Sequence, residues 1–152
     1  MHRLFTQPIR ITDEVIDTNG HTNNLAYLAW MQEIAMAHAA ACGWTLERHA
    51  QEGTSWFIRS HFIEYLRPAM AGDDLVLATW VAGFAARSSP RRYLFWRPHD
   101  QRVIAKAETL WVYVQAATGR PLRVPASVQN AFEVIEDEEE VMQTLVVEFS
   151  QP

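Results

Sequence analysis

Residues 17–27 bring a carboxylate, an imidazole and several amide side chains together just ahead of a long apolar segment. They read Asp17-Thr18-Asn19-Gly20-His21-Thr22-Asn23-Asn24-Leu25-Ala26-Tyr27. Asn19-Gly20 is a turn-forming pair, and Asn23 or Asn24 can cap a helix by accepting a hydrogen bond from a main-chain amide one turn on. Asp17 would then precede a helix N-terminus, whose free amides and positive dipole end stabilise a developing oxyanion. A carboxylate in that place can act as general base on water or attack an acyl carbon itself.

The rest of the sequence offers no competing nucleophile. It contains no Gly-x-Ser-x-Gly motif, and its single cysteine, Cys42, lies at the apolar end of the expected helix, where we expect an inert core thiol. A thiol of pKa about 8.5 can leave as thiolate without a strong proton donor, whereas an amine leaving group needs one. A site with one carboxylate therefore favours hydrolysis of a thioester over cleavage of a peptide. The alternative for Asp17 is an Asx turn that only shapes the loop.

The same residues resemble the Asp-x-x-Gly-His-x-Asn-Asn-x-x-Tyr motif of hot-dog-fold acyl-CoA thioesterases, the 4-hydroxybenzoyl-CoA thioesterase-like group. Further matches follow in the expected order at residues 65–69 and 72–75, and then at 118–121 and 124–125. The resemblance covers residues 3–132. It implies an enzyme that hydrolyses an acyl-CoA to a free acid and CoA, with sites between the subunits of a dimer or tetramer. CoA is then part of the substrate, and no separate cofactor is expected.

By this resemblance the catalytic residues are Asp17, His21 and Asn24. Asn24 would supply a main-chain amide to the thioester carbonyl. His21 would orient Asp17 or contact the same carbonyl, and a structural histidine held by the backbone is an equal alternative. Asn23 and Tyr27 are expected beside the substrate.

A basic segment further along the chain predicts contacts with the phosphates of CoA. We expect it to be a loop, and its candidate residues are Arg87, Ser88, Ser89, Arg91 and Arg92. Guanidinium groups bind phosphate in bidentate fashion. The alternative is a solvated turn, because exposed arginines are common.

Hydrophobic patterning predicts the elements that position these residues. The strongly polar residues of segment 25–42 are only Gln32, Glu33 and His38, which predicts a helix of about 27 Å buried on all sides and closed by Gly43. Strand patterns occupy residues 4–16, 55–67, 75–85, 93–97 and 103–115, followed by a short helix over 127–134. This order predicts an α+β hot-dog fold, in which a curved five-stranded antiparallel sheet wraps a long buried helix.

The domain boundary is expected near residue 134. Residues 1–134 form the predicted hot-dog domain, and residues 135–152 form an acidic C-terminal extension. The acidic run at residues 133–140 is interpreted as a solvated helix or loose tail. Within it, residues 144–149 could add a short strand or pair with another subunit.

Composition excludes several classes of protein. A formal net charge of -5 argues against a general nucleic-acid binder. The first seven residues lack the apolar stretch of a secretory signal, and no segment approaches the roughly 18 apolar residues of a membrane span. The 6 histidines show no i, i+4 pair, so no metal site is expected. A cytoplasmic protein is the resulting prediction.

Two other functions stay open at this point. Asp17-x-Asn19-x-His21 resembles the Asp-x-Asn-Pro-x-His loop of hot-dog hydratases and dehydratases, but it lacks the proline and its histidine comes one residue too early. A non-catalytic acyl-binding protein would keep the fold and have no need of Asp17. The acyl group stays open too, since a pocket built from Trp30, Trp56 and Trp80 would accept an aromatic or a fatty chain.

Overall fold

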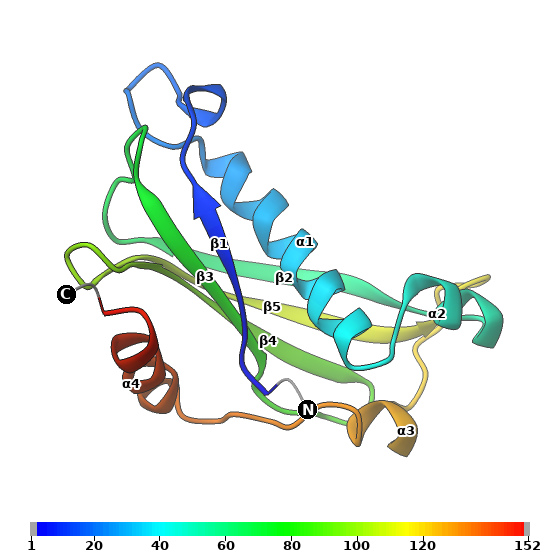
Figure 1. Cartoon of the computed structure of the whole chain (residues 1–152). Helices are drawn as coiled ribbons and strands as arrows, with labels where there is room; N and C mark the ends of the chain where they lie inside the picture. Colours follow the sequence, from blue (N-terminus) through cyan, green and yellow to red (C-terminus); the bar gives the residue numbers. More distant parts are fainter. Residues whose placement is uncertain (1–2, 151–152) are drawn as a thin grey trace.

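The computed structural model describes residues 3–150, so the last two residues of the predicted extension lie outside it. Its elements are β1 (Phe5–Arg10), the 3-10 turn η1 (Asp13–Val15), α1 (Asn24–Ala41), α2 (Leu46–Glu52), β2 (Thr54–Tyr65), β3 (Asp74–Val81), β4 (Ser88–Arg97), β5 (Arg102–Gln115), α3 (Ala126–Gln129) and α4 (Glu138–Glu148). The strands form one antiparallel sheet of five strands, in the order β1-β3-β4-β5-β2. The α+β prediction is confirmed, and the curved sheet carries α1 lengthwise on its inner face (Figure 1).

Both ends of α1 are fixed by local hydrogen bonds. The side chain of Asn23 accepts from the amide of Leu25, which makes Asn23 the N-cap. At the other end Gly43 adopts a left-handed φ of 92°, and the amide of Trp44 donates back to the carbonyl of Ala39. This is a Schellman arrangement, which confirms the predicted closure at Gly43, and Trp44 is buried beneath it.

The helix is covered by the sheet on one side only. Met31 and Ile34 are buried against β3 and β4, whereas Leu25 and Met36 on the outer side are 69% and 42% exposed. The expectation of burial on all sides is therefore wrong for the outer face in the single chain. A five-stranded sheet curves around one side of the rod and leaves the other side uncovered.

The C-terminal extension covers the opposite face of the sheet (Figure 1). Successive residues of β3 point to alternate faces: Leu77 packs in the α1 cluster, and Trp80 packs with Val141 and Leu145 of α4. Of the two alternatives for the acidic run 133–140, the helix is present from Glu138 on, and the chain that follows is packed rather than loose, because Leu145 has no exposed surface. Residues 144–149 lie in and just after a helix rather than in a strand.

Two elements begin where the sequence pattern predicted loops. Thr45 accepts a hydrogen bond from the amide of Arg48 and starts α2, which Gly53 ends in a left-handed conformation. The β4 strand starts at Ser88, so the expected basic loop is largely strand. The start of β4 at Ser88 matters for the site described below, because alternate side chains of a strand point to opposite faces of the sheet.

Strand β2 forms one edge of the sheet. It pairs with β5 along one side, and the described residues contain no strand on its other side. Its large apolar side chains are unusually exposed: Phe62 is 65% exposed and Phe57 47%. An edge strand of this kind is a surface on which a second chain can pair.

Candidate functional site

The Asp17 loop joins β1 to α1 and is closed by its own backbone. The amide of Asp17 donates to the carbonyl of His21 over 2.8 Å, and Gly20, with φ of 77°, turns the chain between them. Oδ1 of Asp17 accepts from the amides of Asn19 and His21, at 2.9 and 3.2 Å. The Asx turn is therefore present, and the half-buried carboxylate is held in one orientation by main-chain donors.

These contacts leave the reactive parts of the loop unengaged. In residues 3–150 no hydrogen bond is made by Oδ2 of Asp17. The amide of Asn24, the first residue of α1, likewise has no acceptor within this range, since the Asn23 side chain takes the amide of Leu25 instead. The structure thus offers one carboxylate oxygen and one helix N-terminal amide for a ligand.

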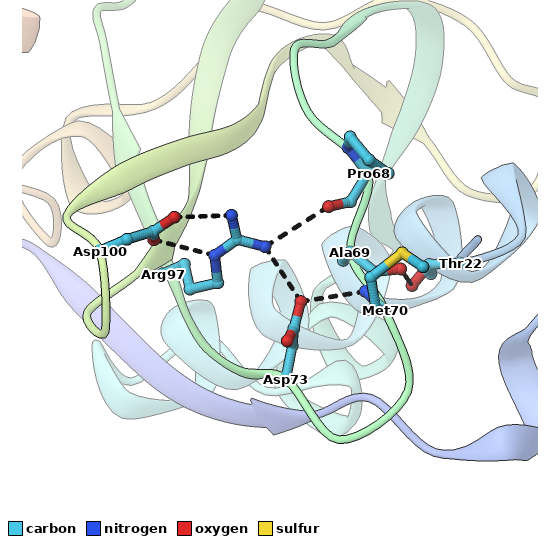
Figure 2. A network of polar contacts seen from close by, with 7 residues as sticks. All are labelled: Thr22, Pro68, Ala69, Met70, Asp73, Arg97 and Asp100. Atoms are coloured by element: carbon cyan, nitrogen blue, oxygen red, sulfur yellow. Dashed lines mark hydrogen bonds and ion pairs between the residues drawn. The ribbon is translucent and has the colours of Figure 1, made fainter. Parts of the chain in front are cut away.

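The loop is anchored to the turn before β3. Both the amide and the hydroxyl of the buried Thr22 donate to the carbonyl of Ala69, at 3.0 and 2.8 Å. That turn is held in place by Arg97, which donates to Asp73 at 3.0 Å and to the Pro68 carbonyl at 3.4 Å. Figure 2 shows this network from Arg97 to Thr22.

Two carboxylates orient the Arg97 guanidinium. Asp100 accepts from both its Nε and Nη2 in bidentate fashion, at 2.9 and 2.7 Å, and Asp73 also accepts from the amide of Met70 (Figure 2). The hydrogen bond from Arg97 lowers the pKa of Asp100. Sequence reasoning did not identify this network, because Thr22, the turn before β3 and Arg97 are distant in the chain, and the pairing of β3 with β4 is needed to bring the turn and Arg97 together.

The other residues predicted around Asp17 take more local roles. The exposed His21 contacts Asp17 through its main chain, and its imidazole makes no hydrogen bond within the described part of the chain. Asn23 serves as the helix cap. Tyr27 is 3% exposed and packs edge-on against Tyr65 and Phe95, so it is a core residue rather than a substrate contact within this chain. Burial raises the pKa of Tyr27 to about 12.

The basic segment does not gather its arginines. Arg87 is exposed just before β4, whereas Arg91 is buried and Arg92 points to the opposite face, where it pairs with Glu108 at 3.0 Å. Ser88 is half-buried, and the hydroxyl of the buried Ser89 donates to the carbonyl of Gly83. The prediction of one phosphate site containing Arg91 and Arg92 is wrong, because alternate residues of a strand face opposite sides.

A pocket of about 220 Å³ opens beside the C-terminal half of α1. Of the three tryptophans expected around the acyl group, only Trp56 lines it, together with Trp44 and Trp111. Trp80 is buried on the other face of the sheet, under α4. Trp30 packs beside Tyr27 and Phe95 in the core.

Among residues 3–150, no group of three or more histidine, cysteine or acidic side chains is placed to hold a metal ion. None of the helices in this range is long and apolar enough to cross a membrane.

Comparison with protein families identifies the class. Residues 9–132 match the model of the thioesterase-like superfamily, and the chain belongs to this family. A search of curated proteins finds no match.

Solved structures support the same fold. A mutant of 4-hydroxybenzoyl-CoA thioesterase in complex with 4-hydroxybenzoyl-CoA superposes with a TM-score of 0.78 at 20% identity, over 85% of this chain and 98% of the other. The 1,4-dihydroxy-2-naphthoyl-CoA thioesterase from Synechocystis gives 0.75 at 18% identity, over 84% and 94%. A hypothetical protein from Staphylococcus aureus in complex with CoA gives 0.78 at 18% identity, over 84% and 80%. The hot-dog fold predicted from the sequence is confirmed.

Proposed function

We propose that this thioesterase hydrolyses acyl-CoA to a free acid and CoA, with Asp17 as the catalytic carboxylate. The observation that carries the proposal is the pairing of Asp17, fixed through Oδ1, with the unengaged amide of Asn24 at the start of α1. A carboxylate oriented by main-chain donors can act through its second oxygen. The helix N-terminus supplies stabilisation for the negative charge that develops on a thioester carbonyl oxygen.

Two mechanisms of thioester hydrolysis are open to Asp17 and the Asn24 amide. As a general base, Asp17 takes a proton from water while the water oxygen bonds to the acyl carbon, and the C–S bond then breaks to release CoA thiolate. As a nucleophile, the carboxylate bonds to the acyl carbon and expels the thiolate, and water then hydrolyses the mixed anhydride. In both forms the Asn24 amide hydrogen-bonds to the carbonyl oxygen as it becomes negative. His21 lies one turn of the loop away and can contact the same substrate.

The edge of the sheet supports assembly as a dimer. Strand β2 has its outer side open and carries exposed Phe57 and Phe62, so pairing of β2 with its copy would satisfy the open backbone groups and bury both rings. The exposed outer side of α1, with Leu25 and Met36, offers a further apolar surface for a partner chain. Sites between subunits, which the family resemblance implies, are compatible with this arrangement.

Arg87 is the member of the basic segment that is free to meet the nucleotide of CoA. It is exposed and heads β4, whereas Arg91 is buried and Arg92 is paired with Glu108. We expect Arg87→Glu to raise KM for acyl-CoA several-fold, because a repelling carboxylate replaces a phosphate-binding guanidinium. KM for an acyl-pantetheine, which lacks the nucleotide, should stay unchanged.

The matched control is Arg102→Glu, at another exposed arginine. Equal effects of Arg87→Glu on both substrates, or an equal effect of the control, would mean that Arg87 is only solvated.

The cytoplasmic location predicted from the sequence stays a prediction.

A thiol-release assay tests the function. We expect turnover of acyl-CoA with stoichiometric release of free CoA thiol from a panel of aromatic and aliphatic substrates. The alternatives predict other outcomes: a hydratase would hydrate an enoyl-CoA without releasing thiol, and an acyl-binding protein would do neither. Either of these results would overturn the proposal.

A further inference from the structure

Arg91 carries a charge into the interior, and it has no acidic partner among residues 3–150. It is 6% exposed, and its Nη1 lies 2.8 Å from Nδ1 of His38 and 3.2 Å from the hydroxyl of Thr79. None of the ion pairs between described residues includes Arg91. Because arginine only donates, Nδ1 of His38 accepts this bond and cannot carry a proton. Both groups that accept hydrogen bonds from the guanidinium are thus neutral.

Such a charge is costly unless something compensates it. Burial removes water from the charged guanidinium of Arg91, and this desolvation lowers its pKa. Buried charges in proteins are normally paired or hydrogen-bonded on all sides. Here both hydrogen bonds leave from Nη1, and within residues 3–150 no protein acceptor takes the protons of Nε or Nη2. That edge of the guanidinium is the one that a carboxylate binds with two parallel hydrogen bonds.

Arg91 is also part of the wall of the apolar pocket. Arg91 lines this cavity of about 220 Å³ with a ring of aromatic side chains, among them Trp44, Trp56, Phe84 and Phe132. No aspartate or glutamate is among the lining residues. The cavity is smaller than the roughly 300–1,000 Å³ that accommodates a whole drug-sized ligand, which suits one end of a longer molecule. The ligand that fits this lining is an apolar group that ends in an anion.

We propose that this pocket is a carboxylate-binding subsite, in which Nε and Nη2 of Arg91 hold a carboxylate at the end of an apolar group. The aromatic walls bury the apolar body, and the guanidinium gains the counter-charge that the protein does not supply. Under the proposed function, this carboxylate belongs to the acyl group of the substrate, at the end distant from the thioester. Only this assignment of the carboxylate rests on the proposed function. The preferred substrates are then CoA thioesters of acids that carry a second carboxylate.

The position of Arg91 separates this site from the aspartate loop. The pocket is lined by residues from the second half of α1, including Ala35 and Ala39, whereas Asp17 lies before the first turn of that helix. Ala35 and Asn24 are eleven residues apart, which corresponds to about 16 Å along the helix. A ligand at Arg91 can therefore be distinguished experimentally from a product acid bound at the helix N-terminus.

A binding experiment tests the site without reference to catalysis. The full-length protein is titrated with 4-phenylbutyrate and with its neutral amide, 4-phenylbutanamide, and tryptophan fluorescence reports occupancy because three tryptophans line the pocket. We expect the carboxylate to bind about tenfold or more tightly than the amide, as charge-assisted hydrogen bonds to a buried guanidinium require. Equal affinities in the unaltered protein would overturn the proposal.

Variants place the preference at Arg91. Arg91→Met should abolish it, whereas Arg92→Met, on the same strand but facing the other way, and Asp17→Asn should both keep it. If Arg91→Met does not fold, Ala39→Phe serves instead: it fills the pocket and should weaken both ligands. A preference that persists in Arg91→Met, or ligands that bind unchanged in Ala39→Phe, would show that the carboxylate lies elsewhere.

Kinetics then test the source of the carboxylate. A series of ω-carboxyacyl-CoA thioesters, from hexanedioyl to dodecanedioyl, is compared with unsubstituted acyl-CoA thioesters of equal chain length. We expect kcat/KM to favour the carboxylated substrate about tenfold or more at one length, and Arg91→Met to remove the advantage. No advantage at any length would overturn the assignment of the substrate. No hydrolysis of any acyl-CoA would overturn the proposed function instead, and the carboxylate preference in the binding experiment would still decide the site.

Discussion

Asp17 is a turn residue in the structure and the catalytic residue of the proposed function. Its Oδ1 accepts two main-chain hydrogen bonds and shapes the loop, while Oδ2 has no partner in the described part of the chain. The sequence posed these roles as alternatives, with the Asx turn competing against catalysis. In the structure Oδ1 alone forms the turn and Oδ2 stays available, so the presence of the turn does not argue against the proposed chemistry.

Arg97 does not contact Asp17 but holds the turn to which the Asp17 loop is anchored. We expect Arg97→Met to lower the free energy of unfolding by about 2 kcal/mol, because hydrogen bonds to charged groups are lost from a largely buried guanidinium. It should also lower kcat, because the Ala69 carbonyl that anchors Thr22 is released. Denaturant unfolding and steady-state kinetics measure the two effects.

The control for Arg97 is another arginine–aspartate pair close by. Arg10 and Asp74 are 2.8 Å apart but largely exposed, so Arg10→Met should cost less than about 1 kcal/mol and leave kcat unchanged. If Arg97→Met behaves like Arg10→Met in both measurements, Arg97 has no part in positioning the loop.

At the residue scale, the sequence predicted local geometry well and burial poorly. Asn23 and Gly43 could be identified because capping depends on neighbouring residues alone. Arg91 could not, since its burial follows from β4 starting at Ser88, within a segment whose serines, proline and arginines favour a loop. One residue of register decides which of Arg91 and Arg92 faces the interior.

At the scale of elements, α1 and α4 give contrasting lessons. The apolar composition of α1 predicted a buried helix, and the sheet does cover its inner side. The exposed side carries Gln32 and Glu33, but the alanines and Met36 around them made this polar signal weak. For α4 the acidic residues of its first turn, 138–140, concealed a buried stripe that includes Val141 and Leu145. That spacing of four is the helical signal that the charge masked.

The packing of α4 leads to a stability prediction. Leu145→Ala should lower the free energy of unfolding by about 2–5 kcal/mol, because a side chain with no exposed surface is removed from the cluster around Trp80 and Trp96. Val147→Ala, at a position that is 81% exposed, should change it by less than about 0.5 kcal/mol. Urea unfolding compares the two. Similar small effects would restore the interpretation of this segment as a loose tail.

At the scale of the whole molecule, the edge of β2 and the outer side of α1 carry large apolar side chains that the described residues leave exposed. We expect sedimentation equilibrium at micromolar concentration to give twice the 17.4 kDa mass of the chain. Phe62→Lys should shift the protein toward the single chain, since a charge on a paired edge opposes strand pairing. Val147→Lys, on the exposed side of α4, is the control and should leave the mass unchanged. A single chain in the unaltered protein would contradict the proposed dimer.

The fold as a whole was predictable because strand, helix and strand order, together with the Asp17 motif, identify the hot-dog class. The site was predictable only as far as it is local in sequence. The anchoring of Thr22 by Ala69 and the placing of Arg91 in the pocket depend on strand pairing between distant segments, which no local pattern specifies.

The most direct test of the account is kcat for Asp17→Asn with an acyl-CoA that the unaltered protein hydrolyses. Asparagine keeps the size of the side chain and the Oδ1 acceptor of the Asx turn, so the loop should persist and KM should change little. Loss of the carboxylate should lower kcat by roughly 10²–10⁴-fold or more. Thermal unfolding of the variant should stay close to that of the unaltered protein. A variant that retains most of its turnover would contradict the assignment of Asp17 as the catalytic carboxylate.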